Sequence, residues 1–270
     1  MIPLNQVHDD LRTFGSASRP LRPSKIGKLL SCAMQIVLDM YDETPGGKAA
    51  QTGNLVHTAA EWYHKTTGVE EARVAAGLEA LEKARDKFPA GDDTAARTIF
   101  AAYAADKENR DAEVVWAEAK VTLTMQADRG DPTGEPIVIS GTLDQVRRDK
   151  NGVLRVWDIK TGTTYSGADN LLMATAQQAV YVLAARETLS KEIQVGGLIH
   201  TAGYAKVKGK VHLPLEMTVE DCDAVLSLVP AIVSQIRQGR PGYRPSVEAC
   251  QWCSHKPWPK CRRSYGGLYG

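Results

Sequence analysis

Apolar residues recur with a helical period in the first third of the chain. Between residues 22 and 41 most apolar positions are three or four residues apart, at Ile26, Leu29, Leu30, Ala33, Ile36 and Val37. This spacing predicts a helix, and Ser24 is its expected N-cap. Residues 53–67 predict a second helix, and the segment 70–110, rich in Ala, Glu and Lys, predicts two or three more.

The pattern then changes to that of strands. Three segments rich in β-branched residues, 113–126, 137–148 and 152–162, are separated by Gly, Pro, Asp and Asn, which are typical of turns. A long helix, two strands and a last helix are expected next, at 170–189, 195–203, 210–217 and 219–239. This order predicts an α/β (α+β) fold in which helices flank a mixed central sheet.

The composition is that of an ordinary globular protein. With 270 residues, 43% hydrophobic and 24% charged, the chain can form one large domain or two small ones. The net charge of +1 neither requires nor excludes a nucleic-acid partner. No apolar run reaches the roughly 20 residues that cross a bilayer, and the first residues lack a signal-peptide pattern. We therefore expect a cytoplasmic protein without a membrane partner.

An acid and a lysine lie close together near the end of the third predicted strand. In VWDIKTG, Asp158 and Lys160 are two positions apart, so their side chains leave the same face of the strand. A hairpin would bring Asp144, expected at the end of the preceding strand, next to Asp158. Neighbouring carboxylates repel each other unless a cation lies between them, and Mg²⁺ or Mn²⁺ prefers oxygen ligands.

Lys160 then has a chemical role to fill. Beside a hydrated metal ion, a lysine can position or deprotonate the attacking water and stabilise charge that develops on a phosphate. For an isolated D-x-K pattern the alternative is a surface salt bridge on an exposed strand.

Four short motifs follow one another along the chain. They are GNLVH with His57, GTLD with Asp144, WDIKTG with Asp158 and Lys160, and QQAVY with Gln177 and Tyr181. In this order they resemble the PD-(D/E)XK nuclease superfamily, and within it the RecB-like exonuclease branch. The resemblance implies a restriction-endonuclease-like core and a metal site made by His57, Asp144, Asp158 and the carbonyl of Ile159.

The resemblance also implies roles for the remaining motif residues. Lys160 would be the polarising group, and Gln177 and Tyr181, one turn apart on a helix, would hold a DNA strand or the lysine beside the metal. Glu118, in VWAEAKV, stands where relatives often carry an acid, but a solvent-facing strand glutamate is at least as good an interpretation.

The cysteines indicate a second metal site. Cys250 and Cys253 form a C-x2-C pair, and Cys261 follows after seven intervening residues, a spacing typical of metal binding in a cytosolic protein. Cys32 is the candidate fourth ligand, whereas Cys222 is expected to be a buried thiol. The split between the chain ends resembles the [4Fe-4S] site of iron-sulfur RecB-like nucleases, including CRISPR-associated exonucleases and AddAB-type B subunits. A structural Zn²⁺ is the alternative.

Positive charge gathers towards the C-terminus. Residues 237–263 contain seven Lys or Arg, beginning with Arg237, and one acid, Glu248. A solvated tail is the simplest interpretation, but a cluster that joins the two chain ends would place this segment beside the first helix. A DNA-contacting surface is then expected from Lys25, Lys28, Arg244, Arg262 and Arg263.

Together these features predict a single nuclease domain over residues 1–270. It would have a mainly helical part (20–110), a catalytic core (111–215) and a C-terminal helix with the cluster segment (216–270). The expected activity is metal-dependent exonucleolytic hydrolysis of DNA at ends or in single strands, in recombination, repair, or phage and CRISPR DNA processing. A recombinase, an annealing protein or a helicase is a conceivable protein partner. The alternatives are a structure- or site-specific endonuclease and a non-catalytic DNA-binding protein.

Overall fold

The computed structural model describes residues 9–40, 47–161, 168–200, 212–215 and 217–242. The helices are α2 (Pro23–Ser31), α3 (Ala33–Asp39), α4 (Lys48–Lys65), α5 (Glu70–Ala84), α6 (Asp93–Ala105), α7 (Lys107–Arg110), α8 (Ala168–Thr188), α10 (Val219–Leu226) and α11 (Val229–Arg237). The strands are β1 (Glu113–Met125), β2 (Ile137–Arg148), β3 (Leu154–Lys160), β4 (Ile193–His200) and β5 (His212–Leu215). Within these ranges, no helix combines the length and apolar character needed to span a membrane.

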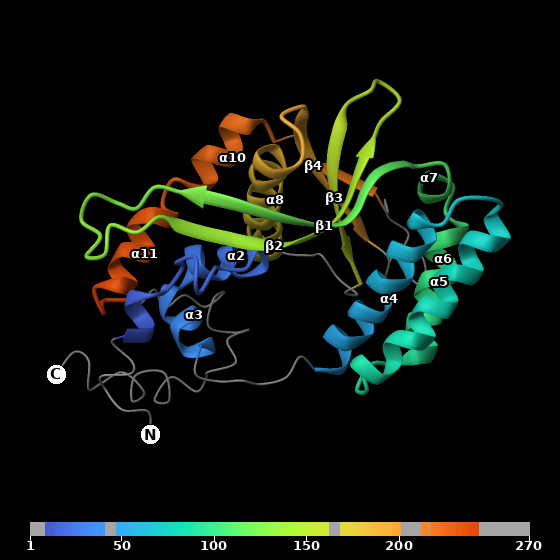
Figure 1. The fold of residues 1–270 in the computed structure, drawn as a ribbon, viewed down its shortest axis with the longest axis horizontal. Coiled ribbons are helices and arrows are strands. Elements are labelled where there is room, and N and C mark those ends of the chain that lie inside the picture. Colours follow the sequence, from blue (N-terminus) through green and yellow to red (C-terminus); the bar gives the residue numbers. More distant parts are fainter. Residues whose placement is uncertain (1–8, 41–46, 162–167, 201–211, 216, 243–270) are drawn as a thin grey trace.

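The five strands form one mixed sheet in the order β1-β2-β3-β4-β5. β1–β2 and β2–β3 are antiparallel, β3–β4 is parallel and β4–β5 is antiparallel. The parallel pair requires a crossover connection, which α8 supplies, while the meander β1-β2-β3 needs only hairpins. The sheet is curled, and helices flank it (Figure 1). The predicted mixed α/β class is therefore confirmed, while its Cys-rich C-terminal segment lies outside the described residues.

Apolar side chains gather in two separate clusters. The larger one lies between the sheet and α2, α3, α8, α10 and α11. The smaller one joins α4, α5 and α6 to Ile159 of β3. We call residues 48–110, which form α4 to α7, the helical lobe; it lies at the opposite end of the molecule from α10 and α11 (Figure 1). The site described below lies where this lobe meets the sheet.

Two predicted helices are interrupted in the structure. The first breaks at Cys32, whose extended backbone (φ −157°, ψ 100°) separates α2 from α3. Arg22 and not Ser24 is the N-cap of α2, because Pro23 occupies the first helical position, where its fixed φ suits the helix and an N–H would have no intrahelical partner. The last helix is divided into α10 and α11, and Pro230 lies in the first turn of the second piece.

Candidate metal-dependent active site

The two predicted aspartates lie next to each other at the point where β2 and β3 stop pairing. Paired residues run from Arg148–Leu154 to Gln145–Trp157, so Asp144 and Asp158 lie just beyond the paired segment. Oδ2 of Asp144 accepts a hydrogen bond from the backbone N–H of Ile159 at 2.5 Å. Asp144 was predicted to end its strand, but β2 continues to Arg148. The hairpin nevertheless brings the two carboxylates together, and both are less than 9% exposed.

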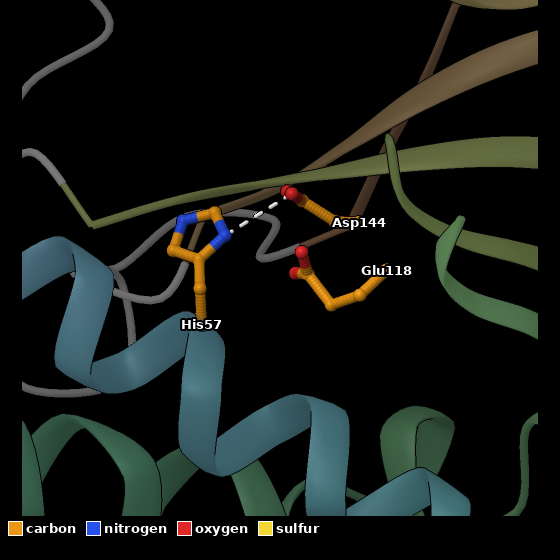
Figure 2. Close-up of side chains that lie close together, drawn as sticks. All are labelled: His57, Glu118 and Asp144. Carbon is orange, nitrogen blue, oxygen red and sulfur yellow. Dashed lines mark hydrogen bonds and ion pairs between the residues drawn. The ribbon is translucent and has the colours of Figure 1, made fainter. Parts of the chain in front are cut away.

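His57 reaches Asp144 from the helical lobe. Its Nδ1 lies 3.1 Å from Oδ1 of Asp144, and the carboxylate of Glu118 from β1 lies beside this pair (Figure 2). α4 can approach the end of β3 closely because residue 53 is a glycine: a Cβ at Gly53 would lie 2.8 Å from Oγ1 of Thr161. One ligand atom from each of His57, Glu118 and Asp144 lies within 4.8 Å of the other two.

Glu118 enters the site through an irregularity in β1. Its φ is +49°, the one positive value found at a non-glycine residue within the described ranges. Strain of this kind is stored where surrounding structure enforces it, often at functional sites. In a regular strand, residues three positions apart face opposite sides. Leu143 and Val146 of β2 both pack into the larger core, so the alternation of β2 also breaks between them, next to Asp144. Sequence alone left two interpretations of Glu118 open, an acid of the site and a solvent-facing glutamate, because a strand pattern carries no signal for such a distortion.

The lysine of the D-x-K motif is held by the helix that follows it. Nζ of Lys160 lies 2.5 Å from Oδ2 of Asp158 and donates to Oε1 of Gln177 at 2.8 Å. The Gln177 amide donates to Oδ1 of Asp158 at 3.3 Å and also lies 3.4 Å from the Tyr181 hydroxyl. That hydroxyl donates to the carbonyl of Thr142 at 2.9 Å. The predicted same-face placement of Asp158 and Lys160, and that of Gln177 and Tyr181, is therefore observed.

The electrostatics of the site favour bound protons in the absence of a cation. Burial alone would lower the pKa of His57, but the carboxylate of Asp144 raises it to about 9. Burial, together with the charge of Asp144, raises the pKa of Glu118 to about 8. Burial and the neighbouring Asp144 also raise the pKa of Asp158, against the effect of Lys160. The pKa of Asp144 is lowered despite burial, because His57 and the N–H of Ile159 stabilise its charge.

This donor set suits a divalent cation. An imidazole and two carboxylates are ligands that Mn²⁺ and Mg²⁺ accept, and a cation would neutralise charges that otherwise repel each other. Both oxygens of Asp158 are already held, Oδ2 by the Lys160 ammonium at 2.5 Å and Oδ1 by the Gln177 amide at 3.3 Å. Of the predicted ligands, His57 and Asp144 belong to the group whose ligand atoms lie within 4.8 Å of one another. Glu118 is a further member of this group. Asp158, also a predicted ligand, is not in the group and contacts Lys160 and Gln177 instead.

The predicted cysteine site is only partly within the described residues. Cys32 lies half-buried at the break between α2 and α3, and Cys250, Cys253 and Cys261 lie outside the described residues. Cys222 is fully buried in the larger core, where burial raises the pKa of its thiol to about 12. This agrees with its interpretation as a buried thiol.

Two residues of the expected DNA-contacting surface lie within the described part of the chain. Lys25 and Lys28 both pair with Asp39, at 2.7 and 3.4 Å, and Arg244, Arg262 and Arg263 lie outside the described residues. Arg237, the first residue of the basic run, is 3% exposed and forms a buried ion pair with Asp131. It therefore supports the fold and does not face a nucleic acid.

We compared the chain with proteins of curated function, with solved structures and with models of protein families. No protein of curated function matches the sequence. A solved structure from Eubacterium rectale, described as a "Putative exonuclease", shares the fold with a TM-score of 0.51 at 11% identity, covering 95% of this chain and 94% of that one. The solved structure of SSO0001 matches with a TM-score of 0.36 at 17% identity over 84% and 91%. The model of the PD-(D/E)XK nuclease superfamily matches residues 20–261, and the chain therefore belongs to that superfamily.

Proposed function

We propose that the protein is a DNA exonuclease that uses Mg²⁺ or Mn²⁺ to hydrolyse phosphodiester bonds at DNA ends or in single strands. The observation that carries this proposal is the meeting of His57, Glu118 and Asp144 with the Lys160–Asp158 pair. Membership of the nuclease superfamily supports hydrolysis of a nucleic acid. The exonuclease assignment extends the description of the Eubacterium rectale protein to this chain.

The residues of the site divide into ligands and a polarising group. His57, Glu118 and Asp144 would hold the cation, with Asp158 and the carbonyl of Ile159 beside them. A bound divalent cation supplies Lewis acidity and lowers the pKa of water. Lys160, whose ammonium Gln177 and Asp158 fix in place, orients the attacking water and stabilises the negative charge on the phosphate.

Gln177 and Tyr181 keep the lysine in its orientation. Oε1 of Gln177 accepts from Lys160 while its amide donates to Asp158, so a single side chain ties both groups to α8. The contact of Tyr181 with the Thr142 carbonyl ties the same helix to β2, two residues before Asp144. α8 thus connects the polarising group with the strand that carries the metal ligand.

Cleavage of two DNA forms tests the activity. End-labelled linear DNA and closed circular DNA are incubated with the protein in Mg²⁺ or Mn²⁺, with a chelator as control. We expect products from the linear form only, which requires both a metal and a free end. Cleavage of the circular form would favour the alternative of an endonuclease on the same fold. Metal-dependent binding without cleavage of either form would favour a non-catalytic DNA-binding protein.

We also propose that Cys32, Cys250, Cys253 and Cys261 hold a structural [4Fe-4S] cluster, with Zn²⁺ as the chemical alternative. The described chain supports this at one point: the N–H of Met34 donates to the carbonyl of Gly242 at 3.2 Å. Gly242 precedes Cys250 by eight residues, a span that reaches at most roughly 29 Å. The last described residue thus lies close to Cys32 and eight residues before Cys250.

Colour and metal content test the cluster. Protein purified without oxygen should be brown and carry about four iron atoms per chain. Cys32→Ala should lose the colour and much of the stability, because metal binding of this kind is coupled to folding, whereas Cys222→Ala should keep the colour. A colourless protein with zinc would replace the cluster by the alternative, and a metal-free protein unaffected by Cys32→Ala would remove the site.

A further inference from the structure

A buried polar network joins the helical lobe to β2 close to the candidate metal site. Its members come from four elements: His64 of α4, Tyr103 of α6, Asn109 of α7, and Gln145 and Arg147 of β2. Apart from the half-buried His64, all are at most 5% exposed. None of them has a role in the chemistry proposed above. Buried polar groups are costly unless they are fully hydrogen-bonded, so this set calls for an explanation.

Every hydrogen bond of the network has a defined direction. Nε of Arg147 can only donate, so the atom of Gln145 that it meets at 2.8 Å is the amide oxygen, and the amide nitrogen faces Tyr103. The hydroxyl of Tyr103 therefore accepts from Gln145 at 2.8 Å and from Arg147 at 3.0 Å. Its single proton is left for Nε2 of His64, at 2.8 Å.

His64 is consequently the neutral end of the chain of hydrogen bonds. Burial and the nearby charges of Arg147 and Arg73 lower the pKa of His64 to about 2, in agreement with its role as an acceptor. At the other end, Arg147 donates to Oδ1 of Asn109 at 2.9 Å, and the Asn109 amide donates to the Tyr103 carbonyl at 3.0 Å. Such a fully satisfied network permits one arrangement of its elements.

The network and the metal site connect the same two elements. Gln145 directly follows Asp144 on β2, and His64 lies two helical turns after His57 on α4. The contact of His57 with Asp144, at 3.1 Å, and the network are therefore two neighbouring attachments of α4 to β2. The network involves none of the carboxylates of the site, so its part of this attachment does not depend on a bound cation.

We propose that the Tyr103-centred network is a positioning device that fixes the distance between His57 and Asp144, and thereby sets the affinity of the site for a divalent cation. The inference rests on the metal site of the proposed function. Mg²⁺ and Mn²⁺ tolerate little variation in ligand geometry, and loss of groups that orient the ligands typically weakens metal binding about 10- to 100-fold. The network residues touch the helix and strand that carry the ligands, so they act through the ligands and not on the substrate.

A pair of hydroxyl deletions separates positioning from general stability. Tyr103→Phe removes the centre of the network, whereas Tyr63→Phe removes the hydroxyl of an equally buried tyrosine that donates to Glu70 at 2.7 Å inside the helical lobe. Mn²⁺ binding is measured by titration calorimetry on the metal-free proteins, with thermal melting alongside. We expect Tyr103→Phe to weaken Mn²⁺ binding at least about tenfold, and Tyr63→Phe to leave it within about twofold of the wild type, whatever each does to stability.

Rescue at the half-buried His64 provides a second test. The amide oxygen of His64→Gln can accept the Tyr103 proton, but His64→Leu cannot, so only the leucine variant should lose Mn²⁺ affinity. Wild-type affinity in Tyr103→Phe, or equal losses in Tyr103→Phe and Tyr63→Phe, would overturn the positioning role while the metal site stands. Absence of Mn²⁺ binding by the wild-type protein would overturn the proposed metal site and the inference with it.

Discussion

Buried charges occur in two regions of this molecule, and they are arranged in opposite ways. In the first, which we call the anchor, Arg237 of α11 pairs with Asp131 at 3.2 Å, and both side chains are 0% exposed. Arg237 also donates to the carbonyls of Phe14 and Glu135 and to the Thr133 hydroxyl, at 2.9, 2.7 and 3.1 Å. Despite burial, hydrogen bonds from Thr133 and the charge of Arg237 lower the pKa of Asp131.

In the candidate active site the buried charges are not balanced. Burial and the charge of Asp144 raise the pKa of Glu118 and that of Asp158, whereas His57 and the N–H of Ile159 lower the pKa of Asp144. The anchor has one cation, one anion and a complete set of hydrogen bonds, which is the arrangement of a structural ion pair. An excess of buried carboxylates without enough cations indicates a site that takes up a further positive charge.

The largest effect is expected at the anchor. Arg237→Ala leaves the buried carboxylate of Asp131 without its partner, which should cost about 3–5 kcal/mol of unfolding free energy. Denaturant unfolding measures the loss. The double variant Arg237→Met, Asp131→Leu removes both charges and should lose clearly less than Arg237→Ala. A loss below about 1 kcal/mol in Arg237→Ala would show that the pair is not a structural anchor.

The corresponding change at the candidate active site should show mainly in the chemistry. Lys160→Ala removes the polarising ammonium, and single-turnover cleavage of linear DNA should slow by about 10²- to 10³-fold. DNA binding, measured in Ca²⁺, should stay close to wild type, because backbone contacts elsewhere carry it. Full cleavage by a carefully purified Lys160→Ala protein would contradict the assignment of this lysine.

The sequence was enough to locate most of this site, for a local reason. Asp158 and Lys160 share a face because strand periodicity places them there, and Gln177 and Tyr181 share a face because they are four residues apart on α8. Their mutual contacts follow from motifs that lie within one meander and the helix after it. Short-range periodicity therefore predicted both the fold class and the D-x-K pair.

Three features that the sequence did not predict depend on residues far apart in the chain or on distorted backbone. Glu118 joins the site through a φ of +49°, which strand alternation does not encode. Arg237 was counted in a basic run for which a solvated tail was the simplest interpretation, but its buried partner Asp131 is 106 positions earlier in the chain. The break at Cys32 likewise has no signal in the sequence, because neither Gly nor Pro stands at that position.

The smallest expected effect is a difference in pH dependence. Groups whose folded pKa is raised stabilise the fold at low pH: His57 contributes fully below about 6.5, its ordinary value, and loses the contribution as the pH passes about 9. Glu118 acts in the same direction, losing its contribution as the pH rises through about 8. The lowered pKa of Asp131 acts only in acid, so the anchor does not change between pH 6.5 and 9.

Thermal melts in a chelator test this difference. The metal-free protein should melt at a lower temperature at pH 9 than at pH 6.5, and the double variant His57→Gln, Glu118→Gln should show a smaller difference. Mn²⁺ should raise the melting temperature most at pH 9, where it no longer competes with protons. If the melting temperature of the metal-free wild type rose from pH 6.5 to pH 9, this would contradict the raised pKa values of His57 and Glu118.

Mn²⁺ titration calorimetry of the metal-free wild type and of Asp144→Asn tests the central claim most directly. The substitution keeps the size of the side chain but removes the negative charge that His57 and the N–H of Ile159 stabilise. We predict that the wild type binds Mn²⁺ with release of protons near pH 7, and that Asp144→Asn binds it at least about 100-fold more weakly. Equal binding by the two proteins, or no binding by either, would contradict a metal site at the junction of α4, β1 and β2.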